Sequence, residues 1–326
     1  MNWHRQLHIF IPGCLLGLFL VLAIAWPKPA IWLSSPRRQA LSELSGGLAQ
    51  AQTIPLASQV GWLEVKRLQG EVSITASEAR PARVGDRLTR SGDRLTTGPR
   101  SLSILQLDNN IGSLQVAQNS SLSIRQLGMT QEGGWLTMLN LDQGQVRFRV
   151  NKEQMPRNSR FEVYSPSGVA GVRGTEFGVM VNPLNRVVIG TETGLVEAEA
   201  NSQQVELPAG SGSAIFPGEA PTAPLPLDRQ LSLDLEEVDY RGDDEIWLSG
   251  KVYPLNTVFA NGIELPVSKT GFFEQQLSYR PTASTTTLTI TPTAALVIRV
   301  ENALGDKQEY ELRGLGQNLI SGQERP

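Results

Sequence analysis

The residues of this 326-residue chain that could do chemistry are carboxylates, lysines, arginines and tyrosines, because imidazole and thiol groups are confined to its N-terminus. The two histidines are His4 and His8, and the one cysteine is Cys14. The sequence beyond residue 14 therefore has no place for a Ser/His/Asp triad, a cysteine nucleophile, a Cys/His zinc site or a disulfide framework. We expect no catalytic residue, no cofactor and no metal ion, and we expect that the protein is not an enzyme.

Charged residues gather in two places without the spacing of a binding site. The acidic stretch from Asp234 to Glu245 lacks the Asp/Asn pattern and the closing glutamate of an EF-hand loop, which favours a solvated acidic face over a calcium site. Four arginines between Arg87 and Arg100 could face an acidic partner, but two aspartates alternate with them and favour a mutually neutralised surface. The formal net charge is −3 and no segment is densely basic, so nucleic acid is not an expected partner.

An apolar run near the N-terminus predicts a hydrophobic helix. Ile9–Trp26 contains no charged residue, and at about 1.5 Å per residue it is just long enough to span a bilayer core. Trp3, Trp26 and Trp32 flank the run, as expected at membrane interfaces. We predict a membrane anchor, with the C-terminal part outside the cytoplasm, in the periplasm or at the cell surface. The alternative is a cleaved signal peptide and a secreted protein.

Apolar residues alternate with polar ones from Val60 onward. The pattern is clear at Val72 and Ile74 and at Val146, Phe148 and Val150. A period of two, with turn residues every eight to twelve positions, predicts an all-β fold. The motif GDRLT occurs at residues 85–89 and 92–96, which leaves both a sandwich and a solenoid-like stack of short strands open.

A proline-rich segment separates two such β-patterned parts. Four prolines between Phe216 and Leu227 predict an extended spacer. Short strands follow it, with Asn261 and Gly262 forming a hairpin signal between two of them, which indicates a β-sandwich. The predicted organisation is an anchor or signal segment (1–33), a linker (34–55), a β-domain (56–216), a proline-rich linker (217–228), a second β-domain (229–315) and a tail (316–326).

Several motifs of the first β-domain occur in the order found in FecR domains. A Gly-Asp-x-Leu turn begins at Gly92, and the stretch from Phe161 to Val181 leads from a strand through proline and small residues into an Arg-Gly-Thr-x-Phe segment. Residues from about 60 to 215 therefore resemble a FecR domain, and residues 229–315 look like a bacterial immunoglobulin-like module. The resemblance implies that the motif residues either hold a turn of the fold or bind a partner; they are Arg173, Gly174, Thr175 and Phe177.

The resemblance leaves two functions open. FecR proteins that regulate sigma factors are implied to receive a signal outside the membrane and to pass it inward through a cytosolic segment of many tens of residues. About eight residues precede the apolar run here. We therefore expect a non-enzymatic binding or scaffold module for an envelope protein or polysaccharide. The alternative is a transmembrane signalling regulator of the FecR sigma-regulator type that works through a separate cytosolic partner.

Overall fold

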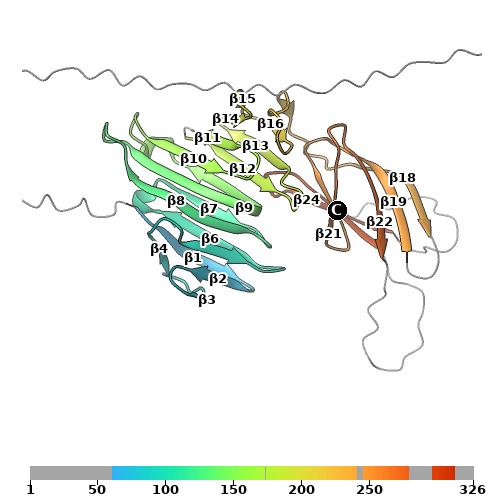
Figure 1. Ribbon diagram of the computed structural model, residues 1–326, viewed down its shortest axis with the longest axis horizontal. Helices are drawn as coiled ribbons and strands as arrows, with labels where there is room; N and C mark the ends of the chain where they lie inside the picture. The colour runs from blue at the N-terminus through green and yellow to red at the C-terminus, as the bar shows by residue number, and fades with distance from the viewer. Residues whose placement is uncertain (1–60, 173, 241–244, 279–295, 313–326) are drawn as a thin grey trace, which may run out of the picture. The chain divides into compact units, whose positions relative to one another are not determined.

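The computed structural model describes residues 61–172, 174–240, 245–278 and 296–312, all within the compact unit Ile54–Pro326 (Figure 1). In these ranges the regular structure consists of strands and two short 3-10 turns, so the predicted all-β class is confirmed. The run Ile9–Trp26 and its predicted helix lie outside the described residues. Within those residues, no helix has the length and apolar character needed to cross a membrane.

Residues 61–226 form two sheets, and we call this part the large β-region. The first sheet runs in spatial order through β4 (Arg87–Leu88), β1 (Leu63–Gln69), β6 (Leu102–Leu107), β7 (Gly112–Val116), β9 (Trp135–Val150), β12 (Glu176–Val181), β13 (Val187–Thr193), β16 (Ser211–Ile215) and β17 (Leu225–Pro226). The second sheet runs through β3 (Ala79–Pro81), β2 (Val72–Thr75), β5 (Arg94–Thr97), β8 (Ser121–Met129), β9, β10 (Arg160–Tyr164), β11 (Val169–Val172), β14 (Leu195–Ala200) and β15 (Gln203–Pro208). The 3-10 turns are η1 (Asp108–Asn110) and η2 (Lys152–Gln154).

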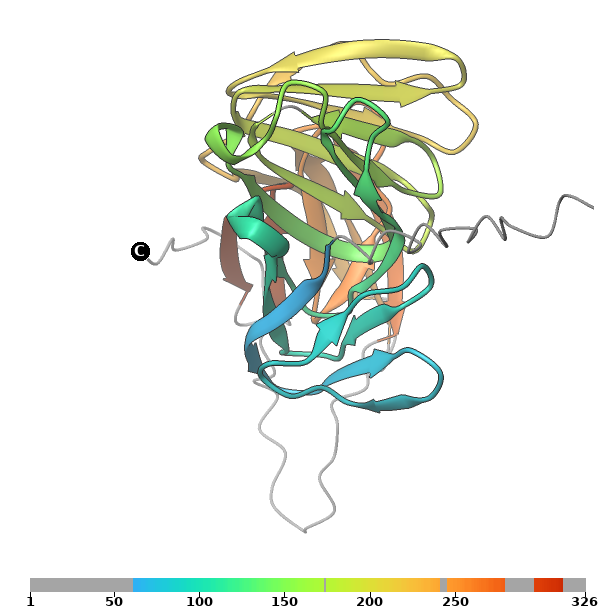
Figure 2. The same ribbon diagram turned by 90° about the vertical axis from the view of Figure 1, so that its left-hand side faces the viewer.

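Strand β9 joins the two sheets. Its first half pairs with β8 and, in parallel, with β10, whereas its second half pairs with β7 and β12. Figure 2 shows the chain building the large β-region from one end to the other, with the colours running from blue to yellow. The strands are thus short and stacked, and they form two layers.

The core of the large β-region lies between the two sheets. Phe148, Phe161 and Phe177 come from β9, β10 and β12 and are 1 % exposed or less. The rings of Phe148 and Phe177 stack with their centroids 4.7 Å apart, and Phe161 meets both rings edge-on at 5.8 and 6.3 Å. Such aromatic pairs add to the stabilisation that burial alone provides.

The two GDRLT copies form equivalent turns in opposite sheets. Gly85 and Gly92 open them with φ angles of 92° and 90°, which glycine adopts without strain. Leu88 then lies in β4 of the first sheet and Leu95 in β5 of the second, and each is buried in the common core. The sequence repeat therefore marks one turn in each layer of the sandwich.

Residues 229–312 form a second pair of sheets, which we call the small β-region. One sheet contains β18 (Leu233–Tyr240), β19 (Glu245–Val252) and β22 (Phe272–Ser278), and the other contains β21 (Ile263–Leu265), β20 (Thr257–Ala260), β23 (Leu296–Glu301) and β24 (Lys307–Leu312). Asn261 and Gly262 connect β20 to β21 with φ angles of 48° and 84°, as the hairpin signal predicts. The immunoglobulin-like topology remains a prediction, because part of the region lies outside the described residues.

Candidate functional site between the two β-regions

The described residues of the family motif predicted from the sequence lie just before β12 and within it. Arg173 lies outside the described residues. Gly174 has a φ of 68°, and a Cβ atom there would come within 2.4 Å of the Cβ of Lys152. Both the backbone conformation and the available space therefore require glycine at this position.

The other two motif residues point into the protein. Thr175 is 2 % exposed, and its carbonyl oxygen accepts a hydrogen bond of 2.9 Å from the amide of Val150. Phe177 has no exposed surface and belongs to the aromatic core. Both side chains are therefore buried in this structure.

A row of glycines on the outer face of the first sheet brings the two β-regions into contact. Gly178 of β12 pairs with Gly190 of β13, which in turn pairs with Gly212 of β16. A Cβ atom on Gly178 would lie 1.8 Å from the carbonyl oxygen of Ala303, and one on Gly190 would lie 3.3 Å from the Ala303 side chain. Only glycine lets the turn at Ala303 approach the sheet this closely.

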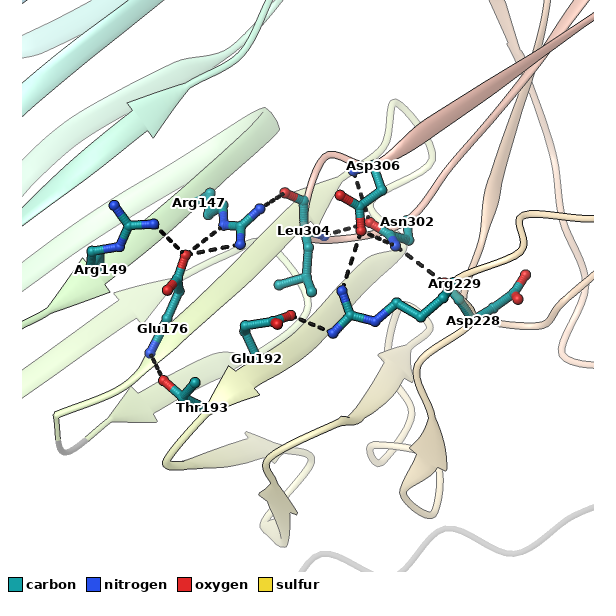
Figure 3. A network of polar contacts seen from close by, with 10 residues as sticks. All are labelled: Arg147, Arg149, Glu176, Glu192, Thr193, Asp228, Arg229, Asn302, Leu304 and Asp306. Carbon is teal, nitrogen blue, oxygen red and sulfur yellow. Dashed lines mark hydrogen bonds and ion pairs between the residues drawn. The ribbon is translucent and has the colours of Figure 1, made fainter. Parts of the chain in front are cut away.

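The turn that packs on this glycine row is held by Asn302. Its Oδ1 accepts hydrogen bonds from the amides of Leu304 (3.0 Å) and Asp306 (3.1 Å), and its Nδ2 donates to the backbone oxygen of Asp228 (3.2 Å). Side chains of β9 bind the same turn, because Gln145 donates to the Asn302 oxygen (2.8 Å) and Arg147 to the Leu304 oxygen (3.3 Å). Figure 3 shows this turn and the surrounding polar network.

Two groups of ion pairs lie beside the turn (Figure 3). Glu176 of β12 lies 2.9 Å from Arg147 and 2.8 Å from Arg149, and the hydrogen bond from Arg149 is the main reason that the pKa of Glu176 is below its ordinary value. Arg229 lies 2.5 Å from Glu192 of the large β-region and 3.5 Å from Asp306 of the small one. Because the Arg229 side chain is half exposed, this link between the regions is weak.

A buried arginine makes a second connection between the β-regions. Arg186, which lies before β13, is 4 % exposed and donates hydrogen bonds to the backbone oxygens of Pro254 (2.5 Å) and Asn256 (3.4 Å). Burial lowers the pKa of Arg186 to about 10, so it remains charged at neutral pH. Its fork of donors suits the two carbonyl groups that the small β-region turns toward it.

A cavity of about 790 Å³ lies in this contact, between the first sheet and the sheet formed by β20, β21, β23 and β24. Its charged lining residues are Arg100, Glu264, Arg299, Glu301, Lys307 and Glu309. Burial raises the pKa of Glu264 to about 7, and Glu301 is shifted in the same direction for the same reason. Within the described residues, no group of histidine, cysteine or carboxylate side chains is arranged to hold a metal ion.

Sequence reasoning missed most of this contact. Arg186 and Gln145 belong to no motif that the sequence displays. The sequence offers one signal for this contact. Glycine occupies an outward position in a strand whose other outward residues are larger, as Gly178 does in β12. The contact also involves the predicted spacer, since Leu225 of β17 packs beside Leu255 and Ala303.

Comparisons with known proteins find similarity to a few solved structures and to one family. Two crystal structures of a putative anti-sigma factor from Parabacteroides distasonis ATCC 8503 are 12 and 13 % identical in sequence, each with a TM-score of 0.36 and 42 % of this chain covered. The match covers 61 % of those chains, so this protein spans about three fifths of their length.

A polysaccharide lyase is 9 % identical, with a TM-score of 0.19, 78 % of this chain covered and 40 % of its own. A comparison with curated proteins gives no match. Residues 93–211, which make up most of the large β-region, match the family described as FecR protein.

Proposed function

We propose that this protein is a signalling regulator of the FecR type, in which the β-regions receive a signal and a separate cytosolic partner carries the response. The observation that supports this proposal is the FecR match over residues 93–211. Of the two functions that the sequence leaves open, the match favours the regulator over the binding or scaffold module. We place the β-regions outside the cytoplasm and the anchor at Ile9–Trp26, as the sequence predicts.

The contact between the β-regions is consistent with a receiving role. Arg186 and the turn at Asn302 tie the small β-region to the sheet that carries the FecR motif. A ligand or partner that changes this contact therefore acts on β12 and β13 directly, without a flexible connection. The described motif residues lie immediately before and within β12, on the same strand as Gly178.

The proposal is tested by rapid depletion of the full-length protein in its source cell, with transcripts measured before the envelope changes. We expect a set of genes with a common promoter sequence to change together, and the full chain to restore their expression. The variant Val84→Ser, which alters an exposed side chain in a loop of the large β-region, is the matched control and should restore expression equally. Unchanged transcripts together with a damaged envelope would overturn the proposal in favour of a scaffold.

A further inference from the structure

The cavity between the β-regions has the size and the lining of a small-molecule site. Its volume of about 790 Å³ lies within the range of roughly 300–1,000 Å³ that such sites occupy. One wall comes from the end of β1, the start of β6, β7, β9 and the end of β12, and the opposite wall comes from β20, β21, β23 and β24. It is therefore lined by the two β-regions together and open to solvent, and neither region forms it alone.

The formal charges of the lining cancel when all of its carboxyl groups are ionised. Three cations, Arg100, Arg299 and Lys307, face three carboxylates, Glu264, Glu301 and Glu309. Arg299 and Glu301 already form an ion pair of 2.6 Å. Because charges of both signs line the cavity, a strongly charged ligand would thus gain little net attraction.

Carboxamide groups dominate the remaining polar lining: Gln69, Gln115, Gln118, Asn119, Gln143 and Gln145. Each can both donate and accept hydrogen bonds. Gln145 uses its amide nitrogen on the Asn302 oxygen and Gln143 uses its own on the Asn119 oxygen, which leaves their side-chain oxygens as acceptors. Within the described part of the chain, the side chains of Gln69 and Gln115 make no hydrogen bond.

This lining complements a neutral molecule that is rich in hydroxyl groups. A hydroxyl group donates one hydrogen bond and accepts others, so it matches a mixture of carboxamides and carboxylates. Apolar side chains in the same cavity offer contact area for C–H surfaces; they are Leu102 and Phe259. Hydroxyl groups and C–H faces together are the surface of a saccharide ring.

We propose that this cavity binds a neutral saccharide, whose hydroxyl groups are hydrogen-bonded by Gln69 and Gln115 on one wall and by the Glu309 carboxylate on the other. The inference rests on the proposed function, because the saccharide is the signal that the regulator receives. The bound saccharide contacts residues of both β-regions. A ligand held in this way strengthens their contact, because it adds hydrogen bonds across it.

The test measures binding of defined neutral saccharides to the full-length protein in detergent micelles by isothermal titration calorimetry. The probes are maltotetraose, cellotetraose, mannotetraose and chitotetraose, with inorganic phosphate and tetraalanine as the charged and peptide probes. We expect at least one neutral saccharide to bind, and the double variant Gln69→Leu/Gln115→Leu to weaken binding at least tenfold. These side chains hold nothing else in the described structure, so the variant should keep the wild-type melting temperature.

Gln126→Leu is the matched control, because Gln126 is an exposed glutamine of β8 outside the cavity and its replacement should leave affinity unchanged. Binding of phosphate or tetraalanine alone, no binding of any neutral saccharide, or full affinity in the double variant would each overturn the inference. Saccharide binding without any transcript response would count against the regulator function and leave the site intact. A transcript response without saccharide binding would count against the site alone.

Discussion

The core of the large β-region and its contact with the small β-region differ in how far they depend on apolar packing. The core is apolar and filled by large side chains, with Phe148, Phe161 and Phe177 at its centre. The contact has only a small apolar cluster around Leu255 and Ala303. Beside it, glycines let the small β-region approach the sheet closely, and a buried arginine and a carboxamide bind backbone oxygens. The core thus gains stability from burial, whereas the contact gains specificity from hydrogen bonds that only one arrangement satisfies.

The largest effect is expected from emptying the core. Phe177→Ala removes the ring that stacks on Phe148 and leaves a cavity, which costs about 3–5 kcal/mol of unfolding free energy. Urea unfolding followed by tryptophan fluorescence measures this loss. Leu184→Ala, at a site that is 61 % exposed, should change the unfolding free energy by no more than about 0.5 kcal/mol. A small loss in Phe177→Ala would show that the core repacks.

Adding one methyl group to the glycine row tests the contact without touching the core. Gly178→Ala places a Cβ against the carbonyl oxygen of Ala303, and overpacking of this kind costs about 1–3 kcal/mol. The small β-region should become sensitive to limited proteolysis while the large β-region stays protected. Gly171→Ala is the matched control, because its nearest atom would be 3.9 Å away. Equal protection in both variants would contradict the close approach.

The buried carboxyl group in the cavity predicts a pH dependence. The pKa of Glu264 is raised from its ordinary value of 4.5 to about 7, mainly by burial, so the folded state holds this proton more tightly than the unfolded state. Its stabilising contribution is complete below about pH 4.5 and is lost as the pH rises through about 7, on the order of 3 kcal/mol.

The melting temperature should therefore fall between pH 5 and pH 8, and Glu264→Gln should flatten this slope. A residual slope of the same sign is expected from Glu301, whose pKa burial also raises. Glu176 does not contribute to this slope, because its pKa is lowered and its effect on the melting temperature therefore lies below pH 4.5. An unchanged slope in Glu264→Gln would mean that this carboxyl group is hydrated.

The smallest effect is expected at the exposed ion pairs of the contact. Arg229→Gln removes the links to Glu192 and Asp306, but the arginine side chain is 50 % exposed, so the cost is about 0–1 kcal/mol. Thermal unfolding in low and in 1 M salt checks this, because salt should reduce the difference further. A loss larger than that of Gly178→Ala would show that charges, and not the glycine row, hold the regions together.

The all-β class, the turns and the family resemblance were all predictable from the sequence. Alternation marks Val146, Phe148 and Val150 as one buried face, and burial of that face follows from strand geometry alone. The hairpin at Asn261–Gly262 is equally local, because positive φ angles are a property of those two residues. The resemblance to FecR domains was confirmed over residues 93–211.

The sequence by itself determined which residues form strands and turns, because those preferences act between neighbours in the chain. Only the tertiary structure decided which outward-facing residues meet the small β-region. Gln145 and Asn302 are 157 positions apart, and no periodicity connects them. Nothing in the sequence around Gly178 or Arg186 marks these two residues. Gly178 nevertheless lies against the backbone of a turn of the small β-region, and the Arg186 side chain is buried against carbonyl groups. Their roles come from the packing of two β-regions, and the cavity that we propose as a saccharide site exists for the same reason.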